Sequence, residues 1–392
     1  MPTTTVEETE KVETGEKNKS ELLLDSLEIK GYRCFEHLTI EKLGRVNLIV
    51  GKNNVGKTAL LEAVYAYVNR GHFQLLIELL LSRDEAHRGV EQPSNRGVIV
   101  NLSFKPLFIS SGNAVNNKKT LVIKGRVNND DEVLYISLPE LRTKEGRLTE
   151  IGEKLAKNSK MFSEDEGSTV EIKYIKENSG ETDLEYYTAL DDSWYVEMKR
   201  FHRINNELMP VEGLRDNQLL ALWDDINKNN LEKSVISAMQ LLEKRIIDIS
   251  FLGVPSGSNN LIPYVEVLNE SSKLPIKRFG NGMTRLLGLS LALSSCRYGV
   301  LFVDEIESGL HYSVLPDVWK LIFKTAKDLN VQVFATTHSK DCIEAFAQIA
   351  NENDVKDDGM LIRLERHGEK IVAKTINEDR LAQAVNHDVE VR

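Results

Sequence analysis

Cysteine is scarce in this chain, and long apolar runs are missing. The three cysteines, Cys34, Cys296 and Cys342, stand far apart and form no C-x-x-C pair, a distribution that argues against a zinc site and against a disulfide framework. We expect all three to be reduced residues of the core. No run approaches the about 18 apolar residues of a membrane helix, and the first residues are polar and acidic, unlike a secretory leader. We therefore expect a soluble, cytoplasmic protein.

The balance of charge is acidic, with 50 Lys and Arg against 60 Asp and Glu and a net charge of −10. This balance argues against a protein covered with nucleic acid, although it leaves room for a local basic face. Hydrophobic residues make up 41% of the 392 residues, enough for one large interrupted domain or for two to three ordinary ones. A chain that is disordered throughout is excluded.

The residue pattern changes twice within the first quarter of the chain. Residues 1–20 hold few aliphatic residues among Thr, Glu and Lys, so we expect a disordered tail. Residues 21–97 begin with short β-rich runs, and the apolar run 46–50 predicts a buried strand. Apolar residues at helical spacing over 58–68 predict a helix, so a strand, a glycine-rich turn and a helix follow one another.

Three further segments follow. Residues 98–215 alternate β-rich runs with turn residues and predict an antiparallel insertion. Residues 216–261 predict a helical arm of two helices, the second of which reaches residue 249. Residues 262–392 alternate strands with helices, which predicts a parallel sheet covered on both faces, and they close with a hairpin. The strands are expected at 264–268, 300–304 and 331–336, and the helices at 283–296, at 313–329 and from 341 onward.

Residues 51–58 read GKNNVGKT and match the pattern G-x-x-x-x-G-K-[ST] in full. The match lies between an apolar strand and a helix start, as a phosphate-binding loop requires. The glycines allow backbone N–H groups to surround a phosphate, Lys57 reaches the β- and γ-phosphates, and the Thr58 hydroxyl ligates Mg²⁺. The expected nucleotide contacts are Gly51, Asn53, Asn54, Gly56, Lys57 and Thr58.

A second strand supplies the acids that such a loop needs. The apolar residues 300–303 lead into Asp304 and Glu305, where the carboxyl end of a parallel strand binds ligands. Asp304 suits the metal and Glu305 the attacking water. A third strand leads to His338, which we expect to sense the γ-phosphate; a structural role at a helix start is the alternative. The expected catalytic residues are therefore Glu305, Lys57 and His338.

The stretch FGNGMTRL, residues 279–286, opens a helix that is apolar nearly all round. A helix start presents free N–H groups and a positive dipole to an anion. The phosphate-binding loop of residues 51–58 (the P-loop) is expected to bind this chain's own nucleotide. The anion at this second helix start is therefore best explained as the nucleotide of a neighbouring subunit; a simple glycine cap is the alternative. The expected contacts in this stretch are Gly280, Asn281, Gly282 and Met283.

The motifs LEIKGYRCF, GKNNVGKT, FGNGMTR, VLFVDEIESGLHYS and FATTHS occur in this order, and the set resembles the ABC-type ATPase heads of the SMC, RecF and OLD families. It is most similar to OLD-like bacterial ATPases labelled as AAA family. The resemblance covers about residues 22–105 and 262–345 and implies an α/β fold: a mixed sheet with helices on both faces, an inserted antiparallel β lobe and a helical bracket. It places 280–283 in the signature loop, His311 in the D-loop and His338 in the switch loop.

The sequence departs from the family pattern at three places. The signature lacks the Ser and Gln of transporter-type proteins, and Gln92, in a Pro- and Asn-rich stretch, fits a surface residue better than a Q-loop. OLD nucleases carry a Toprim domain after the switch histidine, but we expect none after His338, where too few residues follow. Glu212 lies in a string similar to a Toprim motif but lacks the partner acids of a metal site.

By this resemblance the chain binds and hydrolyses ATP with Mg²⁺ and closes as a nucleotide-dependent homodimer or larger even homo-oligomer. It implies a sensor or motor subunit in phage defence or DNA maintenance, with a separate protein effector. DNA is an open question as a partner, and no membrane is expected. The alternative is a nucleotide-gated scaffold with negligible turnover. A nuclease acting alone is least favoured, because no acid cluster stands outside the ATP site.

Overall fold

The computed structural model describes residues 22–89, 98–100, 103–109, 120–127, 130–138, 147, 169–177, 182–188, 195–196, 204–253 and 261–386. The expected disordered tail, residues 1–20, and Gln92 lie outside the described residues. Within the described part, no helix is long and apolar enough to span a membrane.

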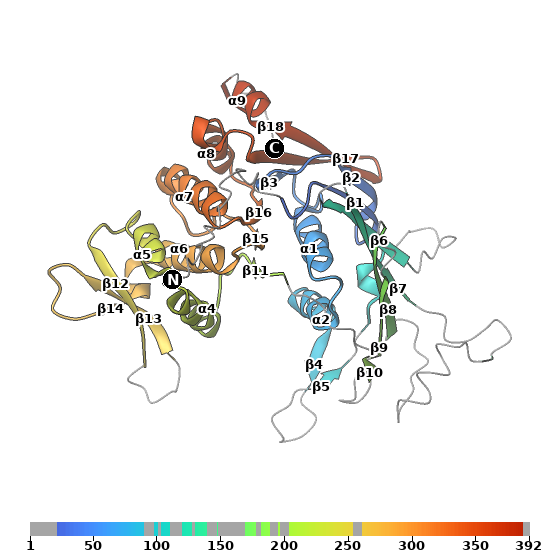
Figure 1. Ribbon diagram of the computed structural model, residues 1–392, viewed down its shortest axis with the longest axis horizontal. Helices are drawn as coiled ribbons and strands as arrows, with labels where there is room; N and C mark the ends of the chain where they lie inside the picture. The colour runs from blue at the N-terminus through green and yellow to red at the C-terminus, as the bar shows by residue number, and fades with distance from the viewer. Residues whose placement is uncertain are drawn as a thin grey trace, which may run out of the picture.

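A six-stranded mixed sheet forms the centre of the molecule (Figure 1). Its order is β11 (Asn206–Met209), β15 (Val300–Val303), β16 (Gln332–Thr336), β3 (Val46–Val50), β17 (Gly359–His367) and β18 (Lys370–Asn377). Neighbouring strands are parallel except in the closing β17–β18 hairpin. Strand β3, from the first half of the sequence, thus lies between two strands of the second half. The expected α/β fold with a mixed sheet is confirmed, and the two halves build one sheet.

Both faces of this sheet are buried, each in its own core. Successive strand residues point to opposite faces, so Leu301 and Val303 enter one core whereas Val300 and Phe302 enter the other. The first core contains α6 (Asn281–Ser295), α7 (Leu315–Asp328) and α8 (Lys340–Ala350), which lie opposite α1 (Lys57–Val68) in Figure 1. This double burial explains why β15 is apolar at every position and not alternating.

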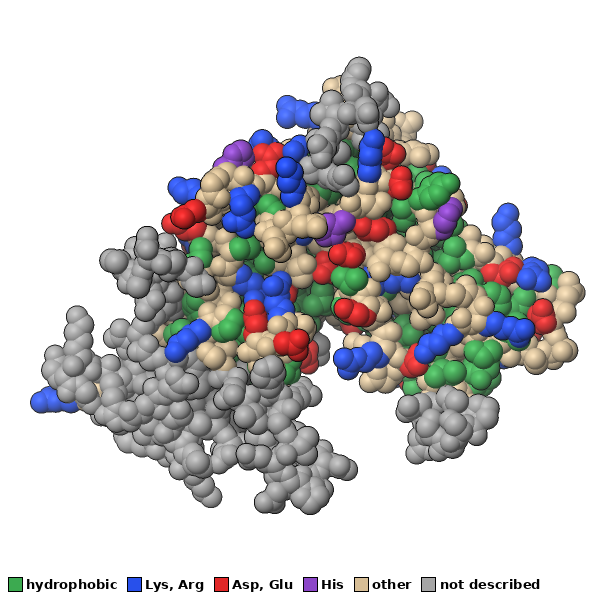
Figure 2. Space-filling view, turned by 180° about the vertical axis from the view of Figure 1, so that it is seen from behind, with side chains coloured by type: hydrophobic (Ala, Val, Ile, Leu, Met, Phe, Trp, Pro, Cys, Tyr) green, Lys and Arg blue, Asp and Glu red, His purple; other side chains and the backbone are tan. Residues whose placement is uncertain are grey.

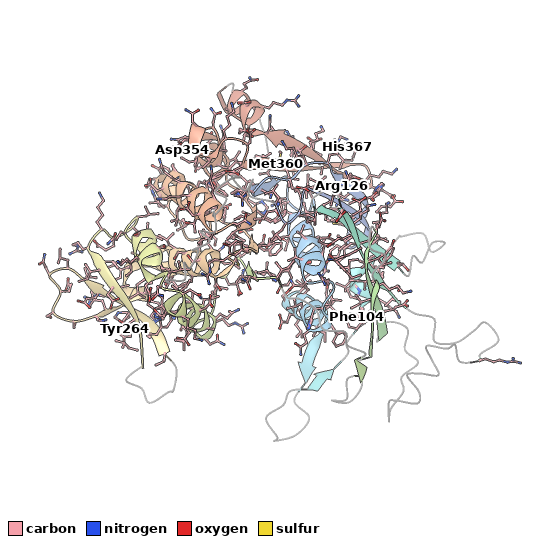
Figure 3. The ribbon with its side chains drawn as sticks, in the orientation of Figure 1. Phe104, Arg126, Tyr264, Asp354, Met360 and His367 are labelled. Carbon is pink, nitrogen blue, oxygen red and sulfur yellow. The ribbon has the colours of Figure 1, made fainter. Side chains whose placement is uncertain are left out.

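The second core lies between the central sheet and a seven-stranded antiparallel sheet. That sheet has the order β10 (Tyr195–Val196), β9 (Thr182–Thr188), β8 (Thr169–Lys176), β7 (Asp130–Ser137), β6 (Thr120–Val127), β1 (Ser26–Tyr32) and β2 (Phe35–Ile40). Helix α1 contacts β15 and β16 on one side and β6 on the other. Met360 of β17 and Phe104, which packs against Phe73 of α2, lie toward opposite ends of this core (Figure 3).

Within 98–215, strands β6 to β10 therefore continue the sheet that β1 and β2 begin. Strand β11 falls within the same expected range, yet it pairs in parallel with β15 in the central sheet. Between these parts lie α2 (Phe73–Ser82), the short 3₁₀ helix η1 (Lys105–Leu107) and the two-stranded pair of β4 (His87–Gly89) and β5 (Val98–Val100).

The expected helical arm is part helix and part sheet. Helices α4 (Asp216–Lys228) and α5 (Glu232–Met239) form where expected. The prediction that the second helix reaches residue 249 is wrong, because β12 (Ile246–Gly253) pairs there with β13 (Leu261–Val267), and β13 with β14 (Leu274–Pro275). Ile246 and Ile249 show the helical i, i+3 spacing, but a β-bulge between Ile246 and Asp248 allows both to be buried from a strand.

The remaining elements are short or terminal. The 3₁₀ helices η2 (Ile276–Phe279), η3 (Tyr312–Val314) and η4 (Asn353–Val355) precede α6, α7 and β17, and α9 (Glu378–Asn386) ends the described chain. All three cysteines are free thiols. Cys296 and Cys342 are buried, as expected, but Cys34 is only partly buried, because it lies in the turn between β1 and β2 beside the P-loop. The expectation that all three are core residues is therefore wrong for Cys34.

Candidate active site

The loop between β3 and α1 can only form with glycine at two positions. Gly51 has φ +145° and Gly56 φ +99°, in the region that favours glycine. A Cβ at Gly51 would lie 2.6 Å from the Leu364 carbonyl oxygen, and one at Gly56 would lie 2.7 Å from the Cys34 sulfur. The loop therefore packs tightly against β17 on one side and against the β1–β2 turn on the other.

The start of α1 faces a cavity without a side-chain cap. Gly56 is the N-cap residue, and no described side chain accepts a hydrogen bond at this helix start. The N–H groups of a helical first turn have no partner within the helix. Combined with the positive end of the helix dipole, they form a binding site for a phosphate group.

Lys57 is held over the loop that precedes it. Its Nζ donates to the carbonyl oxygens of Gly51 at 2.8 Å and Lys52 at 3.1 Å. Burial lowers the pKa of Lys57, whereas the carboxylates of Asp304, Glu305 and Glu307 act to raise it. An anion bound in the cavity would favour the protonated ammonium, so Lys57 is suited to bind phosphate.

A hydroxyl of the first half meets a carboxylate of the second half. The Thr58 Oγ1 lies 3.1 Å from Asp304 Oδ2, and the Thr336 hydroxyl donates to Asp304 Oδ1. Hydroxyl and carboxylate oxygens suit Mg²⁺, which usually keeps waters and phosphate oxygens as its other ligands. Among the described residues no group of three or more His, Cys, Asp or Glu could hold a metal ion.

Glu305 and His338 form a pair beside this carboxylate. Glu305 has φ +46°, and its N–H donates to Thr336 Oγ1 at 2.9 Å. His338 Nε2 lies 3.5 Å from Glu305 Oε1, and both side chains are 39% exposed. A non-glycine residue rarely adopts this backbone conformation, which here turns Glu305 toward the cavity and His338.

One cavity of about 1240 Å³ collects these groups. It is lined by Arg33, Cys34, Gly51, Lys52, Asn53, Asn54, Gly56, Lys57, Thr58, Ala59, Arg83, Glu305 and His338. The expected P-loop residues Asn53 and Asn54 are exposed there, beside the expected acid and histidine of the second half. The structure therefore brings both sets of expected site residues to one place.

Sequence reasoning missed the arginines of this cavity. Arg33 pairs with Glu62 and Glu85, each at 2.8 Å, and Arg83 pairs with Glu62 at 2.6 Å. Burial raises the pKa of Glu62, and the two arginines oppose that shift. The Nη2 atom of Arg33 is buried and has no hydrogen-bond partner in the described part of the chain. The motif LEIKGYRCF contains Arg33, but no local signal places Arg83 at the same wall.

Of the expected signature residues, Asn281 lines a different cavity. This second cavity, of about 710 Å³, is lined by Asn281, Thr284, Arg285, Ser308, Gly309, Lys277 and residues 211–216, and none of them lines the first. Gly280, at φ +88°, and Asn281 are exposed at the start of α6. A Cβ at Gly282 would lie 2.8 Å from the Gly309 carbonyl oxygen, so its hydrogen is needed for packing within the chain.

Met283 and His311, the two other expected nucleotide contacts, lie in different environments. Met283 is buried in the first core at 3% exposure, because α6 turns this side of its first turn toward the sheet. Its side chain therefore belongs to the core, and the expected contact with a nucleotide stays a prediction for its backbone only. His311 is exposed, and its Nδ1 lies 2.8 Å from the Ser313 hydroxyl at the start of η3.

Arg285 joins the signature helix to the acid strand. Its guanidinium donates to the carbonyl oxygens of Asp304 at 2.8 Å and Glu305 at 3.1 Å, and also to those of Pro210 and Val211. Burial lowers the pKa of Arg285, although Asp304 and Glu307 oppose the shift. A movement of α6 would therefore change the hydrogen bonds that Arg285 donates to the backbone of Asp304 and Glu305.

Residues 46–341 match the protein family described as "AAA domain, putative AbiEii toxin, Type IV TA system". The chain is 23% identical over 365 residues to the "ATP/GTP phosphatase" of Helicobacter pylori (strain ATCC 700392 / 26695), covering 90% of this chain and 95% of that protein. It is 48% identical over 48 residues to the "DNA replication and repair protein RecF" of Pseudoalteromonas translucida (strain TAC 125), 12% of this chain and 13% of that one. The solved "SMC head domain from Thermotoga maritima" aligns at a TM-score of 0.43 and 13% identity, covering 91% of this chain and 100% of that one.

The family match spans most of the chain and includes both the P-loop and the acid pair. These two elements line or border the same cavity, with Thr58 hydrogen-bonded to Asp304. The chain is therefore an ATPase that belongs to this AAA-domain family.

Proposed function

We propose that the chain hydrolyses ATP with Mg²⁺ as a homodimer, or a larger even homo-oligomer, in which the signature loop of one copy closes the nucleotide site of the other. One observation carries this proposal: the P-loop, Glu305 and His338 line one cavity, whereas the start of α6 lines another. We further propose that the chain is OLD-like.

The residues around the first cavity fit ATP and Mg²⁺. The N–H groups of the loop from Gly51 to Gly56 and the ammonium of Lys57 would bind the phosphates, and Thr58 and Asp304 would hold the metal. When bound, Mg²⁺ neutralises charge on the phosphate oxygens. The wall formed by Arg33, Cys34 and Arg83 extends the cavity beyond the phosphate loop, which leaves room for the nucleoside.

Glu305 is suited to act as general base. Its carboxylate would orient a water molecule and accept its proton as the water attacks the γ-phosphate. His338, 3.5 Å away, would hold the carboxylate and donate a hydrogen bond to the developing charge. This pairing favours turnover over a nucleotide-gated scaffold, because a scaffold needs phosphate contacts but no base.

The exposed start of α6 supports closure by a second copy. Gly280, Asn281 and His311 are exposed, and none of them lines the first cavity. A helix start with free N–H groups favours an anion, and a triphosphate held by a neighbouring copy supplies one.

The proposed setting is phage defence or DNA maintenance with a separate protein effector. The family description names a toxin–antitoxin system, which supports the first setting, and the local similarity to RecF supports the second. Lys and Arg side chains are interspersed with Asp and Glu over the described part of the face in Figure 2. Such mixing favours a protein partner over a long track of DNA phosphates.

Light scattering tests the dimer with a hydrolysis-deficient chain. Glu305→Gln should be monomeric without nucleotide and dimeric, or a larger even oligomer, with ATP and Mg²⁺. Adding Asn281→Asp should suppress this ATP-dependent assembly, because a carboxylate would meet the triphosphate. The same charge suits the first turn of a helix, so the fold should be kept, and Asn281→Ser is the neutral control. An ATP-dependent dimer that survives Asn281→Asp unchanged would refute the proposed closure.

A further inference from the structure

A third carboxylate follows the acid pair, and the nucleotide site gives it no role. Glu307 Oε1 accepts the backbone N–H of His338 at 2.9 Å and that of Ser339 at 3.1 Å. Its other oxygen, Oε2, is buried and has no hydrogen-bond partner among the described residues. The carboxylate therefore bonds the loop between β16 and α8 with one oxygen only.

Two other hydrogen bonds join the same two loops one step upstream. The N–H of Glu305 donates to Thr336 Oγ1 at 2.9 Å, and the N–H of Ile306 donates to the Thr336 carbonyl oxygen at 3.1 Å. Both of these bonds end at Thr336. Beyond it, Glu307 supplies the hydrogen bonds from the acid loop to the backbone of His338 and Ser339.

The start of α8 has its own cap and does not depend on Glu307. Ser339 is the N-cap residue, and its hydroxyl accepts the N–H of Cys342 at 3.2 Å. The Ser339 N–H also lies 3.0 Å from Thr337 Oγ1. The N–H of His338 donates to the Glu307 carboxylate at 2.9 Å. Glu307 therefore contributes mainly to the position of the His338 backbone.

Two acids of one loop thus hold the same histidine from two sides. The Glu305 carboxylate lies 3.5 Å from the His338 ring nitrogen, and the Glu307 carboxylate binds the His338 backbone. One Glu307 oxygen accepts both backbone N–H groups of residues 338 and 339, so this contact fixes the backbone from which the His338 ring extends. A fixed backbone and a paired ring leave the imidazole little freedom.

We propose that Glu307 is a positioning residue that holds the switch loop so that His338 faces Glu305. This inference rests on the proposed function for its effect on hydrolysis, but the hold itself is a property of the chain without nucleotide. Glu307 acts through geometry: its length and its acceptor oxygen matter, and its charge matters less.

A pair of substitutions separates geometry from charge. Glu307→Gln keeps the length and one acceptor oxygen, so kcat should stay within about threefold of wild type. Glu307→Asp keeps the charge but is one methylene shorter, so it cannot reach both amides; kcat should fall by about 10–100-fold, with KM for ATP within about twofold. An active Asp variant beside an inactive Gln variant would overturn the proposal.

A double substitution tests whether the effect passes through His338. In a His338→Ala chain there is no ring left to position, so adding Glu307→Asp should lower kcat by no more than about twofold. A purely structural carboxylate would lower kcat by the same factor in both backgrounds. Equal factors would therefore contradict the inference, even if Glu307→Asp alone is impaired.

Hydrogen exchange of the nucleotide-free protein completes the test and does not need turnover. Amides of residues 338 and 339 should exchange at nearly wild-type rates in Glu307→Gln and clearly faster in Glu307→Asp, while the β16 amides stay unchanged. Unaltered exchange in Glu307→Asp would overturn the proposed hold. If the wild-type chain released no phosphate, the proposed function would fail, and this measurement would still decide on Glu307.

Discussion

The hydroxyl oxygen of Thr58 lies 3.1 Å from a carboxylate oxygen of Asp304. Thr58 belongs to the first turn of α1, and Asp304 follows the end of β15. Strand β16 lies between β3 and β15 in the central sheet, and α1 packs against β15 and β16. Residues far apart in sequence therefore meet at the carboxyl ends of these parallel strands. A metal at this place would bridge the two halves of the chain.

Thr58→Ala should remove the Mg²⁺-dependent part of ATP affinity, because the hydroxyl is one of the two protein oxygens at the proposed metal position. ATP affinity with Mg²⁺ should then approach the affinity measured in EDTA, and Thr58→Ser, which keeps the hydroxyl, should behave like wild type. Calorimetric titration measures both. A full Mg²⁺ effect in Thr58→Ala would exclude Thr58 as a ligand.

Lys57→Ala should weaken ATP binding by on the order of 10²-fold, since charge-assisted hydrogen bonds to phosphate are lost. The fold should persist, because the Lys57 ammonium bonds only the loop carbonyls of Gly51 and Lys52 in the described structure. Lys42→Ala, at an exposed position that does not line the cavity, is the control. Calorimetry and thermal unfolding check binding and fold, and equal ATP affinity in Lys57→Ala and wild type would contradict this role.

Arg285→Leu should destabilise the fold by about 2–5 kcal/mol, because the carbonyl oxygens of Asp304, Glu305 and Pro210 lose the donor that the buried Arg285 supplies. The shape of the side chain is partly replaced, so the loss is mainly one of hydrogen bonds. Urea unfolding monitored by circular dichroism measures it. A free energy of unfolding within about 0.5 kcal/mol of the wild-type value, roughly the effect of a surface substitution, would show that these hydrogen bonds are dispensable.

Cys34 should react slowly with iodoacetamide, and bound ATP should slow this reaction further. Burial raises the pKa of Cys34, opposed by Arg366, Arg83 and Arg33. Because the pKa is raised, less thiolate is present at pH 7 to 8 than in an ordinary cysteine, and labelling should keep accelerating at pH values above the usual about 8.5. ATP at 100 times its Kd leaves about 1% of the protein free and should slow labelling by up to about 100-fold.

Mass spectrometry after trypsin identifies the labelled cysteine. Cys296 and Cys342 are buried and serve as internal controls that should remain unmodified while the protein is folded. A Cys34 labelling rate that ATP leaves unchanged would mean that the β1–β2 turn does not border the nucleotide.

The central site could be predicted largely from sequence, because its chemistry lies in short local motifs. Gly51 and Gly56 are needed for a backbone that only glycine adopts easily, and Asp304 and Glu305 follow a strand that is apolar throughout. Such signals depend on a few adjacent residues. The burial of Met283 could not be predicted in the same way, because it depends on how α6 is rotated against the sheet.

The missed features depend on contacts between distant segments. Arg83 lines the cavity and is held by its ion pair with Glu62 of α1. Strand β12 looked like a helix because its bulge gives Ile246 and Ile249 a helical spacing. Glu307 lies in a motif that was recognised, yet its bonds to His338 and Ser339 follow from the adjacency of β15 and β16.

The most direct measurement is phosphate release from ATP by wild type and by Glu305→Gln, both with Mg²⁺. The variant keeps the shape of the side chain and a hydrogen bond to His338 but removes the base, so the rate should fall by about 10²–10⁴-fold while ATP remains bound. Glu270→Gln, at an exposed position between β13 and β14, should release phosphate at the wild-type rate. If Glu305→Gln also released phosphate at that rate, Glu305 would not be the base, and the account of this site would be contradicted.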